Sequence, residues 1–450
     1  MSLPPGPRGP AALTTALFAH RPLRMLHRWH RRYGDVFTVH LTGFGAGVYV
    51  ADPLAIKELF TGDQSDLLAG EANSFLTPIL GKHSVLVLDG PEHLRHRRLL
   101  LPPFQGSRVT SYRDTIREIA EREVVRWQPG EQVVLRARMR ALTFEVICRA
   151  VFGVTEPARV ERLRQALGAV LDTANVLLVS DLLRKDLGAW SPGGRLARRL
   201  RVADELLYEE IAERRKLADI ADRDDVLSLL LQARDEDGQG LSDEELRDEL
   251  FTMLAAGHET TATALAFAFE LILRTPGALD RARTAIEEGD DEHLDAIGRE
   301  TLRLRPVLDA AERTLTRPRL VAGWKLPAGA KVYPAIALIH HRADLYPDPQ
   351  AFRPERFTED DTVAYSWLPF GGGIRRCIGA ALAQLELVEV LRVILPAVDL
   401  RLVGDRPDPV VLRGITLSPK HGVRAEVVRR RRPEAGTAGS SRSTSSVALR

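Results

Sequence analysis

The longest run of helical spacing in the chain lies between residues 242 and 274. Apolar side chains recur there every three or four positions, and the run ends just before Pro276. Ser242 precedes it and Glu245 stands three residues later, a capping-box pattern that favours a helix start at this point. About 33 residues with a rise of about 1.5 Å each make a helix near 50 Å long. We expect this helix to cross the whole molecule as its spine.

Shorter patterns precede the spine. Residues 11–33 have helical spacing up to Gly34, which predicts one first helix, and residues 35–41 and 46–51 alternate as two strands. The glycines between those strands, Gly43, Gly45 and Gly47, resemble a dinucleotide-binding loop only superficially, because a strand and not a helix follows. The pattern therefore predicts a hairpin.

The rest of the chain predicts a mainly α fold with a small β region. Short helices and an irregular, partly apolar loop (67–88) are expected over 53–90, a helix from Pro91, and further helices over 108–234, with an apolar, loop-like stretch at 166–187. After the spine we expect strands and turns over 313–327, a proline-rich meander over 347–369 and a helix over 380–395. The expected division is a Pro/Gly-rich lead (1–19), a single domain (20–428) and a basic, Ser-rich disordered tail (429–450).

Composition excludes several classes of protein. The 63 Lys and Arg against 61 Asp and Glu leave a formal charge of +2, so we expect no nucleic-acid partner. No stretch has the roughly 18 to 20 uninterrupted apolar residues of a membrane span, and the N-terminus lacks the pattern of a signal peptide. The two cysteines, Cys148 and Cys377, suit a reducing compartment, and we expect a cytoplasmic location.

The most informative short motif surrounds the second cysteine. Cys377 follows a glycine run and the pair Arg375-Arg376, and directly precedes the helix expected over 380–395. Free backbone N–H groups at a helix start favour a thiolate, so we expect a lowered thiol pKa and a sulfur able to bind iron. Glycines would let this loop pass close to a flat ligand. A buried free cysteine in a glycine-rich turn is the structural alternative.

This loop resembles the haem-binding loop of the cytochrome P-450 family. The family pattern Phe-x-x-Gly-x-Arg-x-Cys-x-Gly is met at Phe370, Gly373, Arg375, Cys377 and Gly379. The resemblance implies the cytochrome P-450 fold and haem b as cofactor, with Cys377 as the iron ligand. Further family-like motifs extend the resemblance over residues 20 to 425.

The spine carries the second motif of that family. Its oxygen-binding pattern is met at Ala256, Gly257, Glu259, Thr260 and Thr261. The resemblance implies that Thr260 hydrogen-bonds dioxygen and that Glu259 helps to deliver protons. A glycine inside a helix costs about 1 kcal/mol, and a groove for a small ligand would explain Gly257; a packing crossing is the alternative. The zinc motif His-Glu-x-x-His fails, because Ala262 stands at its last position.

Charged residues supply the remaining candidates. His93 and Arg97 lie four residues apart on one helix face, either as a solvated basic face or, as the resemblance implies, as donors to haem propionate. Arg313 and Arg375 would complete that set by the same resemblance. It also implies that Glu300, Arg303 and Arg356 form a buried, mutually neutralising triad, which we assign to folding and haem incorporation.

Together, the resemblance of these motifs to the cytochrome P-450 family implies a bacterial haem-thiolate monooxygenase that hydroxylates or epoxidises an apolar organic substrate with O2. Electrons would come from a separate ferredoxin or flavodoxin and its NAD(P)H reductase. We expect this donor to dock on a basic patch of Arg375, Arg376, Arg95 and Arg98. Two alternatives stay open: a haem-thiolate protein that binds a ligand or senses a gas, and a peroxide-driven peroxygenase.

Overall fold

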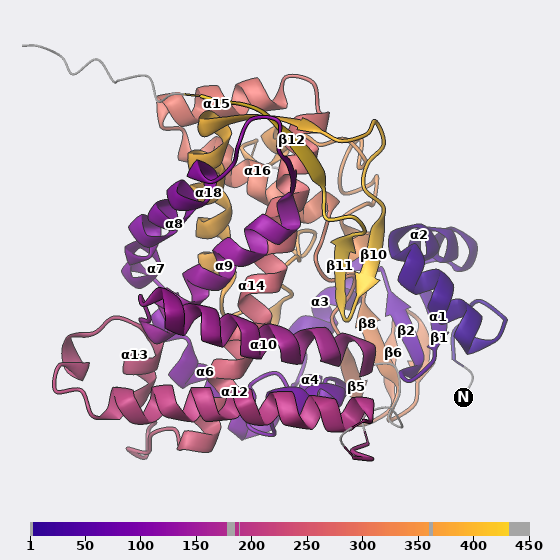
Figure 1. Cartoon of the computed structure of the whole chain (residues 1–450). Helices are drawn as coiled ribbons and strands as arrows, with labels where there is room; N and C mark the ends of the chain where they lie inside the picture. Colours follow the sequence, from indigo (N-terminus) through magenta and orange to yellow (C-terminus); the bar gives the residue numbers. More distant parts are fainter. Residues whose placement is uncertain (1–2, 178–184, 189, 360–362, 432–450) are drawn as a thin grey trace, which may run out of the picture.

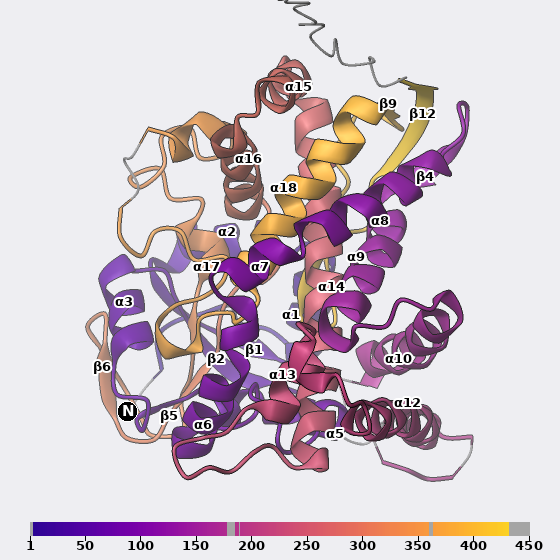
Figure 2. The same cartoon turned by 90° about the vertical axis from the view of Figure 1, so that its left-hand side faces the viewer.

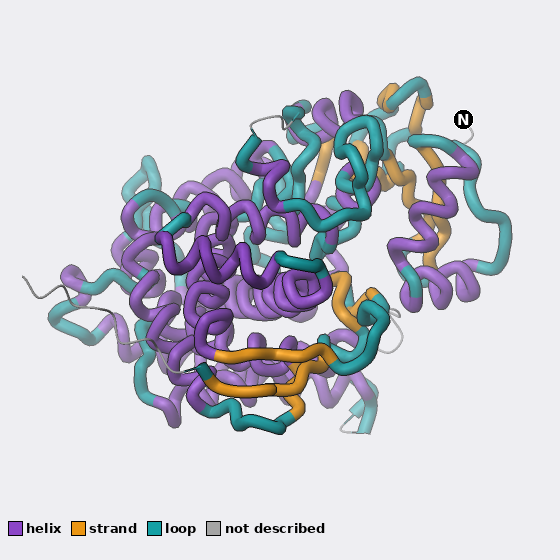
Figure 3. Tube along the Cα trace, turned by 90° about the horizontal axis from the view of Figure 1, so that it is seen from above, coloured by secondary structure: helices purple, strands orange, loops and turns teal. Residues whose placement is uncertain are grey.

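The computed structural model describes residues 3–177, 185–188, 190–359 and 363–431. Helices dominate it, and small sheets lie at its edges; one group of strands lies beside the N-terminus (Figure 3). The mainly α fold class is therefore confirmed. The larger α-helices are α1 (Ala11–His20), α2 (Pro22–Tyr33), α3 (Pro53–Thr61), α6 (Gly90–Leu100), α8 (Arg113–Val125), α9 (Leu135–Phe152), α10 (Pro157–Leu177), α12 (Pro192–Arg215), α13 (Val226–Gln232), α14 (Asp243–Arg274), α15 (Ala278–Glu288), α16 (Asp291–Leu304) and α18 (Ala380–Ala397).

The expected spine is α14. Ser242 caps its N-terminus and Glu245 bonds back to the Ser242 backbone, so the predicted capping box is present. Figure 2 shows α14 running through the molecule with α9 and α18 beside it. Most of its side chains are buried around its whole circumference, as in a helix at the centre of a large core.

Two boundaries in the helical part differ from the prediction. Residues 11–33 form two helices, because Pro22 starts α2 and Arg21 before it leaves the helical conformation. The stretch 166–187 is not a loop from its start, because α10 continues to Leu177. Residues 178–184 of that prediction lie outside the described residues. The short helix expected after residue 53 is confirmed as α3. The stretch 67–88, expected as an irregular loop, is partly helical, with α4 (Ala69–Ala72), the 3-10 turn η1 (Ser74–Leu76) and α5 (Thr77–Leu80).

The predicted hairpin is also present. Strands β1 (Val36–Leu41) and β2 (Gly45–Val50) pair antiparallel, with Val36 opposite Val50. They belong to a sheet of order β1-β2-β8-β5-β3, in which β3 is Leu67–Leu68, β5 Arg313–Leu315 and β8 Lys331–Pro334. The strands expected over 313–327 are β5, β6 (Arg319–Val321) and β7 (Trp324–Leu326). The other strands are β4 (Gln132–Val134), β9 (Val398–Leu402), β10 (Val410–Arg413), β11 (Thr416–Pro419) and β12 (Arg424–Arg430).

At both ends of the chain, residues that were expected to lie outside the domain pack against it. The lead packs on β1, since the Thr38 N–H donates to the Pro5 carbonyl at 3.1 Å and Gly6 has no room for a Cβ against Thr38. At the other end, Arg429 and Arg430 belong to β12 and pair with β9, so a tail starting at residue 429 is wrong for these positions. Carboxylate oxygens of Asp399 hold the Arg429 side chain there.

Among the described residues, none of the helices taken singly is long and apolar enough for a membrane crossing; α14 and α15 meet that test only together, as a pair bent by 112°.

A buried charge triad fixes the meander that leads to the cysteine loop. On α16, Arg303 donates to both carboxylate oxygens of Glu300 at 2.7 and 2.9 Å, and Arg356 donates to Glu300 at 3.1 Å. Arg356 lies in the 3-10 turn η4 (Pro354–Phe357) of the meander, and Arg303 also donates to the carbonyls of Pro349 and Ala351. Glu300 and Arg303 are fully buried. The structure thus brings the three predicted residues together.

Breaking this triad should destabilise the fold. Glu300→Gln leaves two buried guanidinium groups without a counter-charge, so the free energy of unfolding should fall by about 3–5 kcal/mol. Chemical denaturation of the cofactor-loaded protein measures it. Arg353→Ala is the control, because its backbone N–H to Glu300 survives and its side chain makes only a 3.8 Å surface pair with Asp348. Equal losses in both variants would contradict the assignment.

Candidate active site

The cysteine loop ends at the N-terminus of α18. Gly379 is the N-cap residue of that helix, and the Cys377 backbone N–H donates to the Phe370 carbonyl at 2.9 Å. The Cys377 side chain is exposed, yet enough protein surrounds it for burial to raise the pKa of its thiol. The thiol is therefore accessible although protein surrounds it closely.

The expectation of a lowered thiol pKa is therefore wrong for the protein by itself. The Gly379 N–H, Arg97 and Arg376 do lower the pKa of Cys377, but the cost of burying a thiolate is larger. A coordinated metal ion reverses that balance, because it deprotonates a thiol ligand outright.

The glycines of the loop are required by a neighbouring helix. A Cβ on Gly373, whose φ is 62°, would lie 1.9 Å from the Phe60 carbonyl oxygen at the end of α3, and one on Gly372 would lie 3.0 Å from the Phe60 ring. No other residue fits position 373 without moving α3. Gly379 has open space around it and an ordinary φ of −84°, so its place beside a flat ligand stays a prediction. Phe370 meets Trp367 edge to face.

A second place where side chains are accessible is the middle of α14. Ala256 is exposed and Thr260 is half-buried, although both lie on a helix whose neighbouring turns are in the core. The Thr260 hydroxyl donates to the Ala256 carbonyl at 2.7 Å, and the Thr261 hydroxyl donates to the Gly257 carbonyl at 2.9 Å. Such bonds to the preceding turn hold the hydroxyl groups against the helix backbone.

Two predicted residues of this motif, Gly257 and Glu259, contact α9 in the structure. A Cβ on Gly257 would lie 2.9 Å from Ile147 of α9, so a close helix crossing explains the glycine, and its role at a cofactor stays a prediction. Glu259 is held by Arg136 and Arg140 near the start of α9, with the Arg140 Nε 3.1 Å from the carboxylate. Sequence reasoning missed these two arginines, because only the packing of α9 on α14 brings them to Glu259.

Basic residues from three elements meet beside the cysteine loop. His93 and Arg97 come from α6, Arg313 from β5 and Arg375 from the loop; we call these four residues the basic cluster. Arg97 donates to the Arg376 carbonyl at 2.8 Å, and Arg375 donates to the carbonyls of Val85 and Leu88 at 3.1 and 2.5 Å. The structure therefore assembles the set that the sequence predicted.

Mutual repulsion and burial mark this cluster as a binding site for anions. Burial and the neighbouring Arg375 lower the pKa of Arg313 to about 10, and burial lowers the pKa of Arg375 to about 10 although Asp89 acts against the shift. Burial together with Arg375, Arg97 and Arg313 lowers the pKa of His93 to about 3, so His93 is neutral here and not the cation expected. The Nε of Arg313 is buried without a hydrogen-bond partner. A cofactor bearing two carboxylates, such as haem b, fits these residues.

Asp89 is a functional residue that the sequence did not reveal. Its carboxylate pairs with Arg375 at 2.5 Å and accepts from the backbone N–H groups of Ala69, Gly70 and Glu71 at 2.7–3.0 Å. An Asp before Gly90-Pro91 is a typical sign of a helix start, but its use for another helix and for Arg375 depends on tertiary contacts.

The expected basic patch is smaller than predicted. Arg95 is not a free surface cation, because it pairs with Asp235 at 2.6 Å and with Glu245 at 2.8 Å. Arg98 is 65% exposed and pairs with the exposed Glu236. Arg376 is exposed beside Cys377 and, among the described residues, has no ion pair.

Comparisons with known proteins identify the family of this chain. The sequence profile of the family described as Cytochrome P450 matches residues 4–423. The protein named "Putative cytochrome P450 135B1" from Mycobacterium tuberculosis (strain ATCC 25618 / H37Rv) is 44% identical over 440 residues, which are 95% of this chain and 92% of that protein. "Putative cytochrome P450 135A1" from the same strain is 38% identical over 432 residues, 96% of each chain.

Solved structures show the same fold. "Retinoic acid bound cyanobacterial CYP120A1" superposes with a TM-score of 0.83 at 27% identity, over 95% of this chain and 100% of that one. "Crystal structure of cytochrome P450DA heme domain" has a TM-score of 0.84 at 24% identity, over 96% and 98% of the two chains, and so supports the fold alone. From the profile match and these relatives, the chain belongs to the cytochrome P450 family.

Proposed function

We propose that this protein inserts one oxygen atom from O2 into an apolar organic substrate, with Cys377 as the haem ligand and a separate protein as electron donor. Its family is one of haem-thiolate monooxygenases, and the cofactor is haem b. When bound, that cofactor activates O2, and thiolate ligation favours O–O cleavage. The observation that carries the proposal is the exposed Cys377 thiol beside Arg97 of the basic cluster.

The residues of the chain divide the work around the cofactor. We assign the carboxylates of haem b to the basic cluster, where Arg97, Arg313 and Arg375 supply charge and His93 supplies a neutral ring N–H. We assign the transfer of a proton to Oγ1 of Thr260, whose hydroxyl is half-buried on the open turn of α14. Glu259, which directly precedes Thr260 in the sequence, is the proposed proton source, and it must leave Arg136 or Arg140 to act.

Apolar side chains support the proposed substrate class. The partly buried Phe75, Leu86 and Val87 come from the segment before α6, and Met253 and Ala255 come from α14 next to the open turn. A solved structure similar to this chain holds retinoic acid, a largely apolar molecule. A screen for spectral shifts on adding apolar compounds would narrow the substrate. A cytoplasmic location is part of the proposal, supported by two cysteines that are both free thiols.

Thiolate ligation has a direct spectroscopic test. The reduced carbonyl complex should absorb at about 450 nm, because a cysteine thiolate donates electron density to the iron. Cys377→His should abolish that band, whereas Cys148→Ala, which changes the buried cysteine of α9, should keep it. A wild-type band at about 420 nm in freshly prepared protein would count against thiolate ligation.

Proton delivery through Thr260 predicts uncoupling. Thr260→Ala should retain haem and substrate binding, while product per electron consumed falls about tenfold or more and peroxide is released, because general acid catalysis is worth at least that much. Thr263→Ala is the control, since Thr263 is fully buried on the same helix. Unchanged coupling in Thr260→Ala would remove this residue from the mechanism.

The two alternative functions have a separate test. Product formed from peroxide alone, without donor and O2, would favour the peroxygenase alternative. If neither peroxide nor the donor with O2 gives product, a ligand-binding role is favoured.

The electron donor is proposed to be an acidic ferredoxin or flavodoxin that docks near Arg376 and Arg98. Exposed charges are screened beyond about 10 Å at 0.1 M salt, so the first electron transfer should slow as salt rises. Arg376→Glu and Arg98→Glu should slow it several-fold at low salt and leave the carbonyl spectrum unchanged. Arg406→Glu, in the turn between β9 and β10, is the matched control. If neither salt nor either charge reversal changes the rate of the first electron transfer, the donor docks elsewhere.

A further inference from the structure

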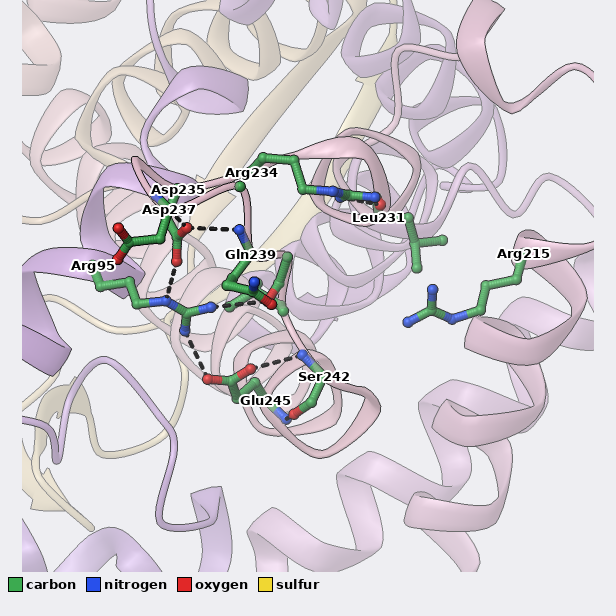
Figure 4. A pocket seen from close by; sticks show the side chains of 12 residues that line it. Arg95, Arg215, Leu231, Arg234, Asp235, Asp237, Gln239, Ser242 and Glu245 are labelled. Atoms are coloured by element: carbon green, nitrogen blue, oxygen red, sulfur yellow. Dashed lines mark hydrogen bonds and ion pairs between the residues drawn. The ribbon is translucent and has the colours of Figure 1, made fainter.

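A pocket of about 740 Å³ lies at the start of α14. The loop 234–242 lines it together with Arg95, Arg215 and Glu245. Figure 4 shows the Arg95 guanidinium between Asp235 and Glu245, and the Glu245 carboxylate turned toward Ser242 as well. Glu245 is thus a wall residue of an open, polar pocket.

On its inner side, Glu245 begins a row of titratable groups. Its Oε1 lies 3.2 Å from Nε2 of His96, and Nδ1 of His96 lies 2.8 Å from Oε1 of Glu249. The exposed fraction of these side chains falls from 17% for Glu245 to 3% for His96 and 0% for Glu249. The row therefore leads from the pocket into the dry interior, between α6 and α14.

Glu249 is able to change its protonation state at the end of this row. Its Oε2 is buried with no hydrogen-bond partner. Burial raises the pKa of Glu249 to about 7, with a further increase from Asp248, while His96 and the backbone N–H of Val85 act against the shift. Burial would lower the pKa of His96, but Glu249 and Glu245 raise it above the ordinary value. A histidine between two carboxylates is suited to pass a proton from one to the other.

Glu249 and His96 lie close to the basic cluster. The charged groups around them are Glu245 and Asp248 of α14. Arg95 of α6 pairs with Glu245 and also with Asp235 of the loop. The segment before α6 contributes Val85, whose N–H lies on the Glu249 side and whose carbonyl accepts from Arg375 at 3.1 Å. One residue, Val85, therefore separates Glu249 from an arginine of the basic cluster, and His93 lies one helical turn before His96.

We propose that Glu249 is a proton-exchanging residue coupled to reduction of the haem, and that Glu245 and His96 connect it to solvent in the pocket. The proposal rests on the proposed function only for haem binding and its one-electron reduction. An electron from the donor adds one negative charge at the haem, and one proton from a hydronium ion in the pocket offsets it by forming an O–H bond at Glu249. The hydronium ion loses one O–H bond and becomes water, and Glu245 and His96 gain no net proton.

The test is the dependence of the haem reduction potential on pH. Below about pH 7 Glu249 is already protonated before reduction; as pH rises through that value it is ionised and must take up a proton, so reduction becomes less favourable. The equilibrium constant for one-electron reduction should fall by up to tenfold per pH unit in that range, which corresponds to about 59 mV. Spectroelectrochemical titration of the haem-loaded protein, with a chemical reductant and mediators, measures it without substrate or protein donor.

Glu249→Gln should remove most of this slope, while Glu244→Gln, the same change at a neighbouring residue of α14 that is 70% exposed, should keep it. Equal slopes in wild type and Glu249→Gln would overturn the proposal. If Glu249→Gln does not retain haem, reduced-minus-oxidised infrared spectra of wild type and Glu249→Asp decide instead. Reduction of wild type should produce a protonated carboxyl band that shifts in the Asp variant, and its absence would overturn the proposal. If the reduced carbonyl complex of the wild-type protein lacks the thiolate band, the proposed haem ligation is wrong, and the result does not bear on Glu249.

Discussion

The cost of burying charge organises this molecule. Cations from α6, β5 and the cysteine loop are brought together beside Cys377, where burial and mutual repulsion lower the pKa values of Arg313 and Arg375. Such an arrangement is tolerable only if a carboxylate-bearing group binds there. Within the chain, Asp89 supplies part of that balance.

The same constraint explains how the structural scaffold differs from the site. In the triad, the Glu300 carboxylate faces the guanidinium groups of both Arg303 and Arg356, which also donate to backbone carbonyls of the meander, so these residues need no ligand and hold the meander in place. At the basic cluster, Asp89 balances only part of the positive charge, so a carboxylate-bearing cofactor can supply the rest. The row Glu245, His96 and Glu249 lies between these extremes, because a proton can supply or remove the missing charge.

Much of the site could be predicted because its residues stand in short, fixed patterns. The motif around Cys377, the α14 motif at Ala256 to Thr261 and the pairs on α6 and α16 each depend on spacing along one element, and the structure has those elements where the patterns indicated. For individual glycines, the local pattern did not reveal which neighbouring residue the glycine accommodates. Gly257 faces Ile147 and Gly373 faces Phe60, contacts between segments more than 100 residues apart that no local pattern contains.

By itself the sequence determined the long capped helix α14, the hairpin, the mainly α class and the identity of the cysteine loop, because helix caps, periodicity and short motifs are local properties. Only the tertiary structure decided which charges are free and which are neutralised. Arg95 is held by Asp235 and Glu245, Glu259 by two arginines of α9, and the Cys377 thiol has a raised pKa despite its helix N-terminus. Charge state depends on burial and on partners distant in the chain, and both arise only when the helices pack.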